Sequence, residues 1–127
     1  MKHILTAALC VLLFPNDATA SASTGSQFLS MCKAALAPLS GSESAEYIVK
    51  WAMDTGFCAG YVEGYTVALQ KSGKGVSTAA CFPENLNNDQ ALRVLIEFLE
   101  NNPAELHRGV GSSAQRAFSR AFPCSKG

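Results

Sequence analysis

The sequence predicts an all-α protein, a small disulfide-stabilised bundle of about four helices that follows a cleaved signal peptide. Three observations lead to this prediction. Apolar residues recur at intervals of three and four along most of the chain, which is the spacing of amphipathic helices. The chain has 127 residues, 48% of them hydrophobic, which suits a single core in one domain of residues 21–127. Finally, four cysteines follow a segment typical of exported proteins.

The first 20 residues have the composition of a secretory signal peptide. Lys2 precedes an apolar run from Ile4 to Phe14, and small residues surround Ala20. A helix that spans a bilayer needs about 20 apolar residues, so this run of about eleven is too short to be one. We therefore expect cleavage after Ala20, with Ala22 as an alternative site, and no membrane segment in the mature chain.

Four cysteines remain in the mature chain: Cys32, Cys58, Cys81 and Cys124. An even number of cysteines in a short exported domain predicts two disulfides in an oxidising compartment. Each bridge would stabilise the fold by roughly 3 to 4 kcal/mol in the chain-entropy model. Four cysteines allow three pairings.

The first helix is expected to begin near Gln27. Residues 21–25 are small and polar, and they are predicted to form a disordered leader. The helix ends before Pro38 and Gly41. Its apolar face carries Phe28, Leu29, Cys32, Ala35, Leu36 and Leu39.

A second, longer helix is predicted from about Ser40 to Lys71. Ser40 and Glu43 have the spacing of a capping box. Glycines recur every four residues in this helix, at Gly56, Gly60 and Gly64. They would form a groove where another backbone can approach closely. A kink or interruption of the helix is expected at Gly56. Each glycine disfavours a helix by roughly 0.8 to 1 kcal/mol, so tertiary packing must offset them. The core-facing side carries Cys58, Tyr61, Val62, Tyr65 and Leu69.

A third helix is predicted from the Asn87 cap to Asn101, after a loop at residues 72–78. Gln90 stands three residues after the cap, as in a capping box. Apolar residues cover two sides of this helix, so two sides must be buried. Two alternatives remain open: it is the central helix of the bundle, or its second face contacts another chain.

A fourth helix is predicted from Leu106 to Ala121, after Pro103. The short connection makes the third and fourth helices antiparallel neighbours. This geometry favours a disulfide between Cys81 and Cys124, which leaves Cys32 to pair with Cys58. The charged residues of segment 84–105 are acidic except for Arg93, and those of segment 108–126 are all basic. This asymmetry predicts surface ion pairs across the hairpin, or recognition of the two segments by a partner.

The composition argues against several classes of function. The net charge is zero, so no basic surface for nucleic acid is expected. His107 is the only histidine after the signal peptide, and the cysteines are better used in disulfides than as zinc ligands. No nucleophile with a positioned base can be identified. We therefore expect no enzyme activity, no metal and no cofactor.

Five short motifs recur in a characteristic order along nearly the whole mature chain. They are Phe28, Leu29, Cys32; Cys58, Gly60, Tyr61, Val62, Gly64; Cys81, Pro83; Gln90 with Pro103, Leu106, His107; and Ala121, Phe122, Pro123, Cys124. Together these motifs resemble the Rap/Tai family of immunity proteins. The resemblance implies a periplasmic, all-helical homodimer. It also implies a protein that binds and occludes a peptidoglycan amidase effector delivered by type VI secretion.

The connection between the third and fourth helices is our candidate for the partner-binding surface. It is polar and lies between rigid helices, and binding residues are often placed on such loops. The candidate residues are Asn101, Asn102, Glu105 and His107. The alternative function is a small periplasmic stress-related binding protein or acid-type chaperone without a toxin partner.

Overall fold

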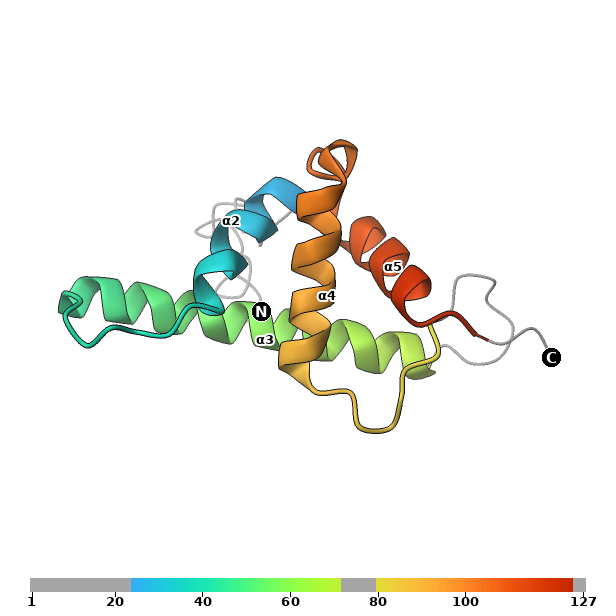
Figure 1. Cartoon of the computed structure of the whole chain (residues 1–127), viewed down its shortest axis with the longest axis horizontal. Coiled ribbons are helices and arrows are strands. Elements are labelled where there is room, and N and C mark those ends of the chain that lie inside the picture. Colours follow the sequence, from blue (N-terminus) through green and yellow to red (C-terminus); the bar gives the residue numbers. More distant parts are fainter. Residues whose placement is uncertain (1–23, 72–79, 125–127) are drawn as a thin grey trace, which may run out of the picture.

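The computed structural model describes residues 24–71 and 80–124, and this part of the chain is all-α as predicted (Figure 1). The helices are α2 (Gly25–Ala35), α3 (Ala45–Lys71), α4 (Asn88–Asn101) and α5 (Val110–Ala121), with a short 3-10 helix, η1 (Pro103–Glu105). The predicted signal peptide and the loop at residues 72–78 lie outside the described residues. None of the described helices has the length and apolarity needed to cross a bilayer.

Helix α4 lies at the centre of the bundle and contacts α2, α3 and α5 (Figure 1). One of its sides is buried through Ala91, Leu92, Leu95, Ile96 and Leu99. The second apolar side, with Val94 and Phe98, packs partly buried against the same core. The Arg120 guanidinium of α5 lies 5.3 Å from the centre of the Phe98 ring. Of the two alternatives for this helix, the structure therefore favours the central helix.

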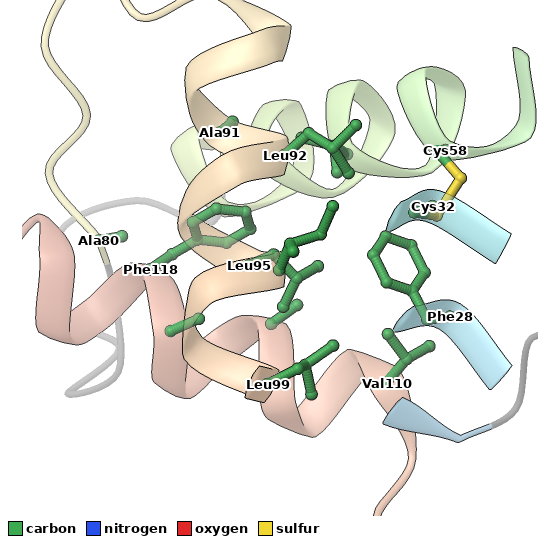
Figure 2. Packing of buried hydrophobic residues seen from close by; sticks show 14 residues of the cluster. Phe28, Cys32, Cys58, Ala80, Ala91, Leu92, Leu95, Leu99, Val110 and Phe118 are labelled. Carbon is green, nitrogen blue, oxygen red and sulfur yellow. A yellow bond between two sulfur atoms is a disulfide. The ribbon is translucent and has the colours of Figure 1, made fainter. Parts of the chain in front are cut away.

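The core is a single cluster to which all four α-helices contribute. Leu95 and Leu99 of α4 lie between Phe28 of α2 and Phe118 of α5 (Figure 2). Phe28, Leu95, Leu99 and Phe118 are fully buried, as is Val62 of α3. Side chains of this size each contribute about 1.5–3 kcal/mol when buried. The core therefore holds helices that are far apart in sequence in one unit.

Two helix starts have capping boxes. Asn87 and Gln90 cap α4, as the sequence predicts. Thr24 and Gln27 cap α2 in the same way. The expectation of a disordered leader over residues 21–25 is therefore wrong for Thr24 and Gly25, because the hydroxyl of Thr24 satisfies a backbone N–H of the first turn.

The predicted start of the second helix at Ser40 is wrong. The carboxylate of Glu43 accepts hydrogen bonds from the backbone N–H groups of Ser40 (2.6 Å) and Gly41 (2.9 Å). Gly41 has φ +87°, which favours glycine, so these residues close a turn rather than begin a helix. Helix α3 begins at Ala45, where the hydroxyl of Ser44 accepts from the N–H of Tyr47 (3.2 Å).

Helix α3 continues without a break through Gly56, contrary to the expected kink or interruption. Cys58 and Val62 are buried, as predicted for its core-facing side. The groove of glycines is not filled, because a Cβ atom built at Gly56, Gly60 or Gly64 meets no atom within 4 Å. The close approach expected at these glycines is therefore not made within the described residues.

The two disulfides join the pairs that the sequence favours. Cys32–Cys58 ties α2 to α3 across 26 residues, and Cys81–Cys124 ties the segment before α4 to the end of α5 across 43 residues. An isolated antiparallel bridge between Ala80 and Pro123 lies beside the second disulfide. Each bridge thus joins segments that are distant in sequence.

Helix α5 begins at Val110, four residues later than predicted. Pro103 begins η1, which ends at Glu105. The chain then turns back, and the carbonyl oxygens of Leu106 and Arg108 accept hydrogen bonds from the first turn of α2. Residues 106–109 are used in this contact and do not extend the helix.

Candidate functional site

The candidate site is the connection between α4 and α5, residues 101–109, which lies at the end of the bundle where α4 ends (Figure 1). Two asparagines close the end of α4. The side-chain amide of Asn101 donates to the carbonyl oxygen of Glu97 (2.9 Å), and that of Asn102 donates to the carbonyl oxygen of Phe98 (2.7 Å). Asn101 is exposed, whereas Asn102 is partly buried. Asn101 is therefore the more accessible of the two predicted residues.

Glu105 points into the protein rather than toward solvent. Its side chain is only 12% exposed. The carboxylate accepts hydrogen bonds from the hydroxyl of Ser113 (3.0 Å) and from Nε of Arg116 (3.2 Å). It also forms an ion pair with Arg108 (3.6 Å). These contacts are among the ion pairs predicted for this hairpin, and they occupy the carboxylate within the chain.

His107 and Arg108 are exposed. Pro103 and Ala104 are exposed as well, one turn earlier. Together with Asn101 they form what we term the exposed edge of the connection: Asn101, Pro103, Ala104, His107 and Arg108. This edge combines apolar, amide and cationic groups, which suits contact with a protein surface better than catalysis.

The connection is held in place by the first turn of α2. The backbone N–H of Gly25 donates to the carbonyl oxygen of Arg108 (2.9 Å), and that of Ser26 donates to the carbonyl oxygen of Leu106 (2.9 Å). A Cβ atom at Gly25 would lie 2.7 Å from the carbonyl oxygen of Glu105 and 2.8 Å from Cδ2 of Leu99. Only glycine allows this approach. Gly25 could not be identified from the sequence because it lies in a run of small polar residues without periodicity.

A shallow groove of ≈ 320 Å³ runs beside the connection, between α4 and α5. Asn101 and Asn102 line it at one end, and Phe98 and Arg120 lie along it. The groove is open and has both polar and apolar walls. It extends the exposed edge of the connection into a larger surface.

Of the motif positions on α3, Cys58, Tyr61 and Val62 belong to the core, whereas Gly60 and Gly64 are exposed. The Tyr65 hydroxyl donates to the carbonyl oxygen of Gly111 in α5 (2.6 Å). The Tyr61 ring lies between those of Phe28 (5.2 Å between centroids) and Tyr65 (6.0 Å). Burial raises the pKa of both tyrosines above 10.0. Both hydroxyls therefore stay neutral at physiological pH, and the rings join three helices.

The proline positions Pro83 and Pro123 belong to the segments around the second disulfide. Pro83 accepts a backbone hydrogen bond from Leu86 in a turn before α4, and Pro123 forms the bridge with Ala80. Both are exposed. They shape the ends of helices and are not part of the connection.

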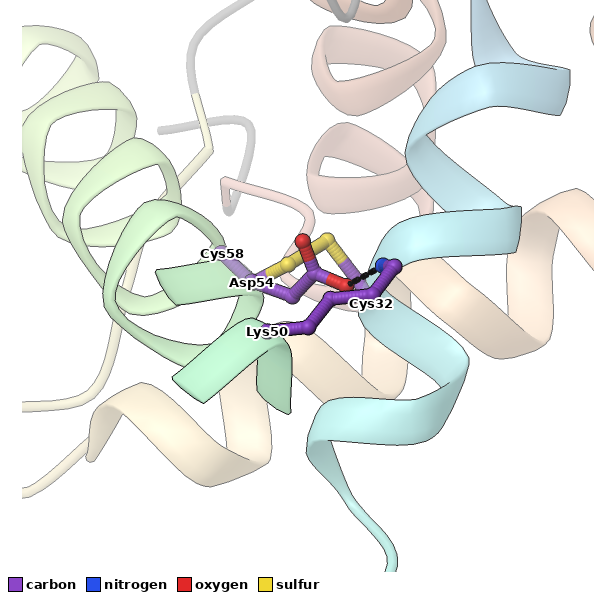
Figure 3. Close-up of a disulfide and its surroundings, with 4 residues drawn as sticks. All are labelled: Cys32, Lys50, Asp54 and Cys58. Carbon is purple, nitrogen blue, oxygen red and sulfur yellow. Dashed lines mark hydrogen bonds and ion pairs between the residues drawn. A yellow bond between two sulfur atoms is a disulfide. The ribbon is translucent and has the colours of Figure 1, made fainter. Parts of the chain in front are cut away.

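The first disulfide lies beside an ion pair within α3 (Figure 3). The ammonium group of Lys50 binds the carboxylate of Asp54, whose side chain is 13% exposed and lies next to Cys32–Cys58. All four cysteines of the described residues are in disulfides, so none of these four offers a thiol. Within the described residues, no cluster of three or more histidine, cysteine or acidic side chains could hold a metal ion.

Comparison with protein families gives a match over residues 24–124 to the model of Rap1a immunity proteins. The match spans all four helices and both disulfides. No curated protein and no solved structure matches the chain.

Proposed function

Because the chain belongs to the Rap1a immunity protein family, we propose that it is exported to the periplasm and blocks a peptidoglycan amidase effector delivered by type VI secretion. Membership of the family makes it an immunity protein for a secreted effector. The identity of the effector as an amidase, and its delivery route, are our proposal. The observation that carries the proposal is the family match over residues 24–124.

The proposed mechanism is occlusion, not catalysis. The family is generally non-enzymatic, and an inhibitor needs only a surface that covers the catalytic cleft of its target. We place this surface at the exposed edge of the connection and the adjoining groove. Two backbone hydrogen bonds from α2 and the Glu105 contacts keep the connection rigid. Rigidity favours tight binding because little conformational entropy is lost when the complex forms.

The primary test is the hydrolysis of peptidoglycan by an amidase encoded beside this protein. The reaction is followed with and without the purified, oxidised mature chain. We expect complete inhibition near a one-to-one ratio. Full hydrolysis at excess inhibitor, with no complex on size-exclusion chromatography, would reject the amidase as the partner.

A second test locates the inhibitory surface. Replacing Glu105 would be a poor choice, because the loss of its buried contacts would itself disturb the connection. The substitution Ala104→Glu instead adds a bulky charge to the exposed edge. Ala37→Glu, at an exposed turn after α2, is the matched control. We expect a loss of inhibition with Ala104→Glu alone, and equal inhibition by both variants would exclude this edge.

The alternative function, a periplasmic chaperone, is favoured by one observation. Several large apolar side chains of α3 are exposed, as expected of a protein that binds unfolded clients. A chaperone would suppress the aggregation of an unrelated denatured protein. We expect no such suppression at concentrations at which the amidase is fully inhibited.

The resemblance also predicts a homodimer, and we retain this prediction. The face of α4 that the sequence offered for such a contact is largely used within the bundle. The dimer surface must therefore be sought on another element.

A further inference from the structure

Helix α2 is attached to the second half of the connection by its first turn. The backbone N–H groups of Gly25 and Ser26 donate to carbonyl oxygens of residues 106–109, each at 2.9 Å. Thr24, which precedes the helix, forms an isolated antiparallel bridge with Gly109. The N–H groups in the first turn of a helix have no partner within the helix. Here they hold a segment that carries part of the exposed edge of the connection.

The same helix is attached to α3 by the first disulfide. Cys32 lies two turns after Gly25, about 10 Å along the helix axis, and is bonded to Cys58 of α3. The buried residues of α2 are Gly25, Phe28 and Cys32, which share one side of the helix. Phe28 and Cys32 both face the core (Figure 2). The disulfide therefore fixes the side of α2 that also lies against the connection.

Helix α2 is too short to be stable without its neighbours. It has 11 residues, and isolated helices of fewer than about 12–15 residues are marginal in water. Its position therefore depends on tertiary contacts, chiefly Phe28 in the core and the covalent bond at Cys32. Without that bond, only non-covalent contacts keep α2 against α3. A shift of α2 would move its two hydrogen-bond donors away from the connection.

We infer that Cys32–Cys58 is a positioning disulfide: through α2 it holds residues 106–109 in the conformation that binds the effector. This inference rests on the proposed function, in which the exposed edge of the connection covers the target. Both cysteines are fully buried. The disulfide therefore acts through α2 and not by direct contact with an effector.

Formation of this bridge is then the step that makes the chain a strong inhibitor. The thiols of Cys32 and Cys58 together lose two electrons and two protons to a protein disulfide or a small-molecule disulfide, which is reduced to two thiols. Such an oxidation is favoured outside the cytoplasm, whereas cytosolic thiols are kept reduced. The chain would therefore gain its full affinity for the effector only after export.

The second disulfide provides a matched control. It joins the segment before α4 to the segment after α5, at the end of this hairpin opposite the connection. The bridges span 26 and 43 residues. Loop length enters the chain-entropy model only as a logarithm, so their contributions to stability are similar. Two double variants therefore separate positioning from general stability: Cys32→Ala/Cys58→Ala and Cys81→Ala/Cys124→Ala.

The first test is hydrogen exchange measured by NMR without effector. In the variant without the first bridge, the amides of Gly25 and Ser26 should exchange about tenfold or more faster, relative to the amide of Leu95 in the buried centre of α4. The ratio to Leu95 removes the effect of unfolding of the whole chain. The variant without the second bridge should keep the wild-type ratio. Equal ratios in the two variants overturn the inference.

The second test is inhibition of the amidase at a temperature at which circular dichroism shows both variants folded. Loss of the first bridge should raise the concentration needed for half inhibition by about tenfold or more, because the connection must then be ordered on binding. The variant without the second bridge should inhibit like the wild type. Equal inhibition by the two variants overturns the inference. If the wild-type chain inhibits no amidase, the proposed function fails, and hydrogen exchange still decides whether the bridge positions the connection.

Ser26→Pro tests the link through α2 with both disulfides intact. Proline removes the N–H group that donates to the carbonyl oxygen of Leu106, and it is tolerated in the first turn of a helix. Ser26→Ala keeps this N–H group and is the control. We expect about tenfold weaker inhibition with proline alone, because a backbone carbonyl loses its hydrogen bond. Equal inhibition by the proline and alanine variants overturns the inference, even if the chain without the first bridge does not fold.

Discussion

At the scale of single residues, glycine has opposite roles at two places in this fold. Gly25 lies against the connection, where a methyl group would collide with backbone and side-chain atoms. The backbone N–H of Gly25 also donates to Arg108, so its position decides where the connection lies. Gly111 in α5 instead has room, since a Cβ would be 3.7 Å from the Tyr61 hydroxyl and 3.8 Å from Cε2 of Tyr65.

We predict that Gly25→Ala destabilises the protein by about 1–3 kcal/mol, the usual effect of forcing extra atoms into a packed site. Gly111→Ala is the matched control. It should be neutral or stabilising by up to about 1 kcal/mol, because alanine favours a helix and meets only ordinary contacts. Urea unfolding of both variants measures the difference. Equal stabilities would contradict the close approach at Gly25.

Glu43 provides a prediction on pH. Hydrogen bonds from the backbone and hydroxyl of Ser40 lower the pKa of its carboxyl from 4.5 to about 2. Since the folded pKa is the lower one, the turn at residues 40–43 is stabilised above pH 4.5, and this contribution is lost as the pH falls toward 2.

An NMR titration of the Glu43 carboxyl group should therefore show a midpoint near 2. Ser40→Ala, which removes the hydroxyl but keeps the backbone N–H, should move the midpoint part of the way toward 4.5. A wild-type midpoint at 4.5 would show that the turn does not form in solution.

At the scale of the elements, the two disulfides differ in accessibility. Cys32 and Cys58 are fully buried between α2 and α3, whereas Cys81 and Cys124 are exposed where chain segments meet. In the chain-entropy model the two bridges contribute about 3.5 and 4 kcal/mol, respectively. The two disulfides thus stabilise the fold by similar amounts, but they should differ in how readily a thiol reduces them.

We predict that mild reduction under native conditions opens Cys81–Cys124 first. A thiolate must reach the sulfur that it attacks, and Cys32–Cys58 can be reached only when α2 separates from α3. Alkylation followed by peptide mass spectrometry should detect label on Cys81 and Cys124 before Cys32 and Cys58. In denaturant both bridges should be reduced together, and selective early labelling of Cys32 would contradict the packing of α2 on α3.

At the scale of the whole molecule, the connection and the exposed large apolar side chains lie on different elements. The connection is at the end of α4, and the exposed apolar side chains belong to α3, which α4 crosses (Figure 1). A homodimer that forms through a surface other than the connection would leave both connections free. Each copy could then bind one effector independently.

We therefore predict a complex of two immunity proteins and two effectors. Light scattering coupled to size-exclusion chromatography measures its mass. A mass that corresponds to one copy of each protein would contradict this prediction.

Capping-box spacing predicted one helix start correctly but failed to predict another. The Asn87–Gln90 capping box was predicted correctly, whereas the same spacing at Ser40–Glu43 closes a turn. Both stretches have suitable side chains. The difference is that Gly41 takes a positive φ and Ser44 caps the helix instead. Such competition between neighbouring caps cannot be resolved from spacing alone.

The candidate site was predicted in position but not in detail. The connection lies where expected, since Pro103 ends one helix and the next must turn back. That Glu105 faces inward depends on Ser113 and Arg116, which reach it only after α5 packs on α4. The importance of Gly25 depends in the same way on a segment about 80 residues later in the chain.

The sequence by itself determined the all-α class, the approximate position of each helix and the favoured cysteine pairs. These features depend on apolar spacing, capping residues and the number of cysteines, which act locally or along one short hairpin. Only the tertiary structure decided that α4 is central and that the glycine face of α3 stays open. Helical spacing shows which residues share a face, but whether that face is covered depends on where the other helices pack. On α3 the core needs one side only, and the opposite side is exposed in the part of the chain that the structure describes.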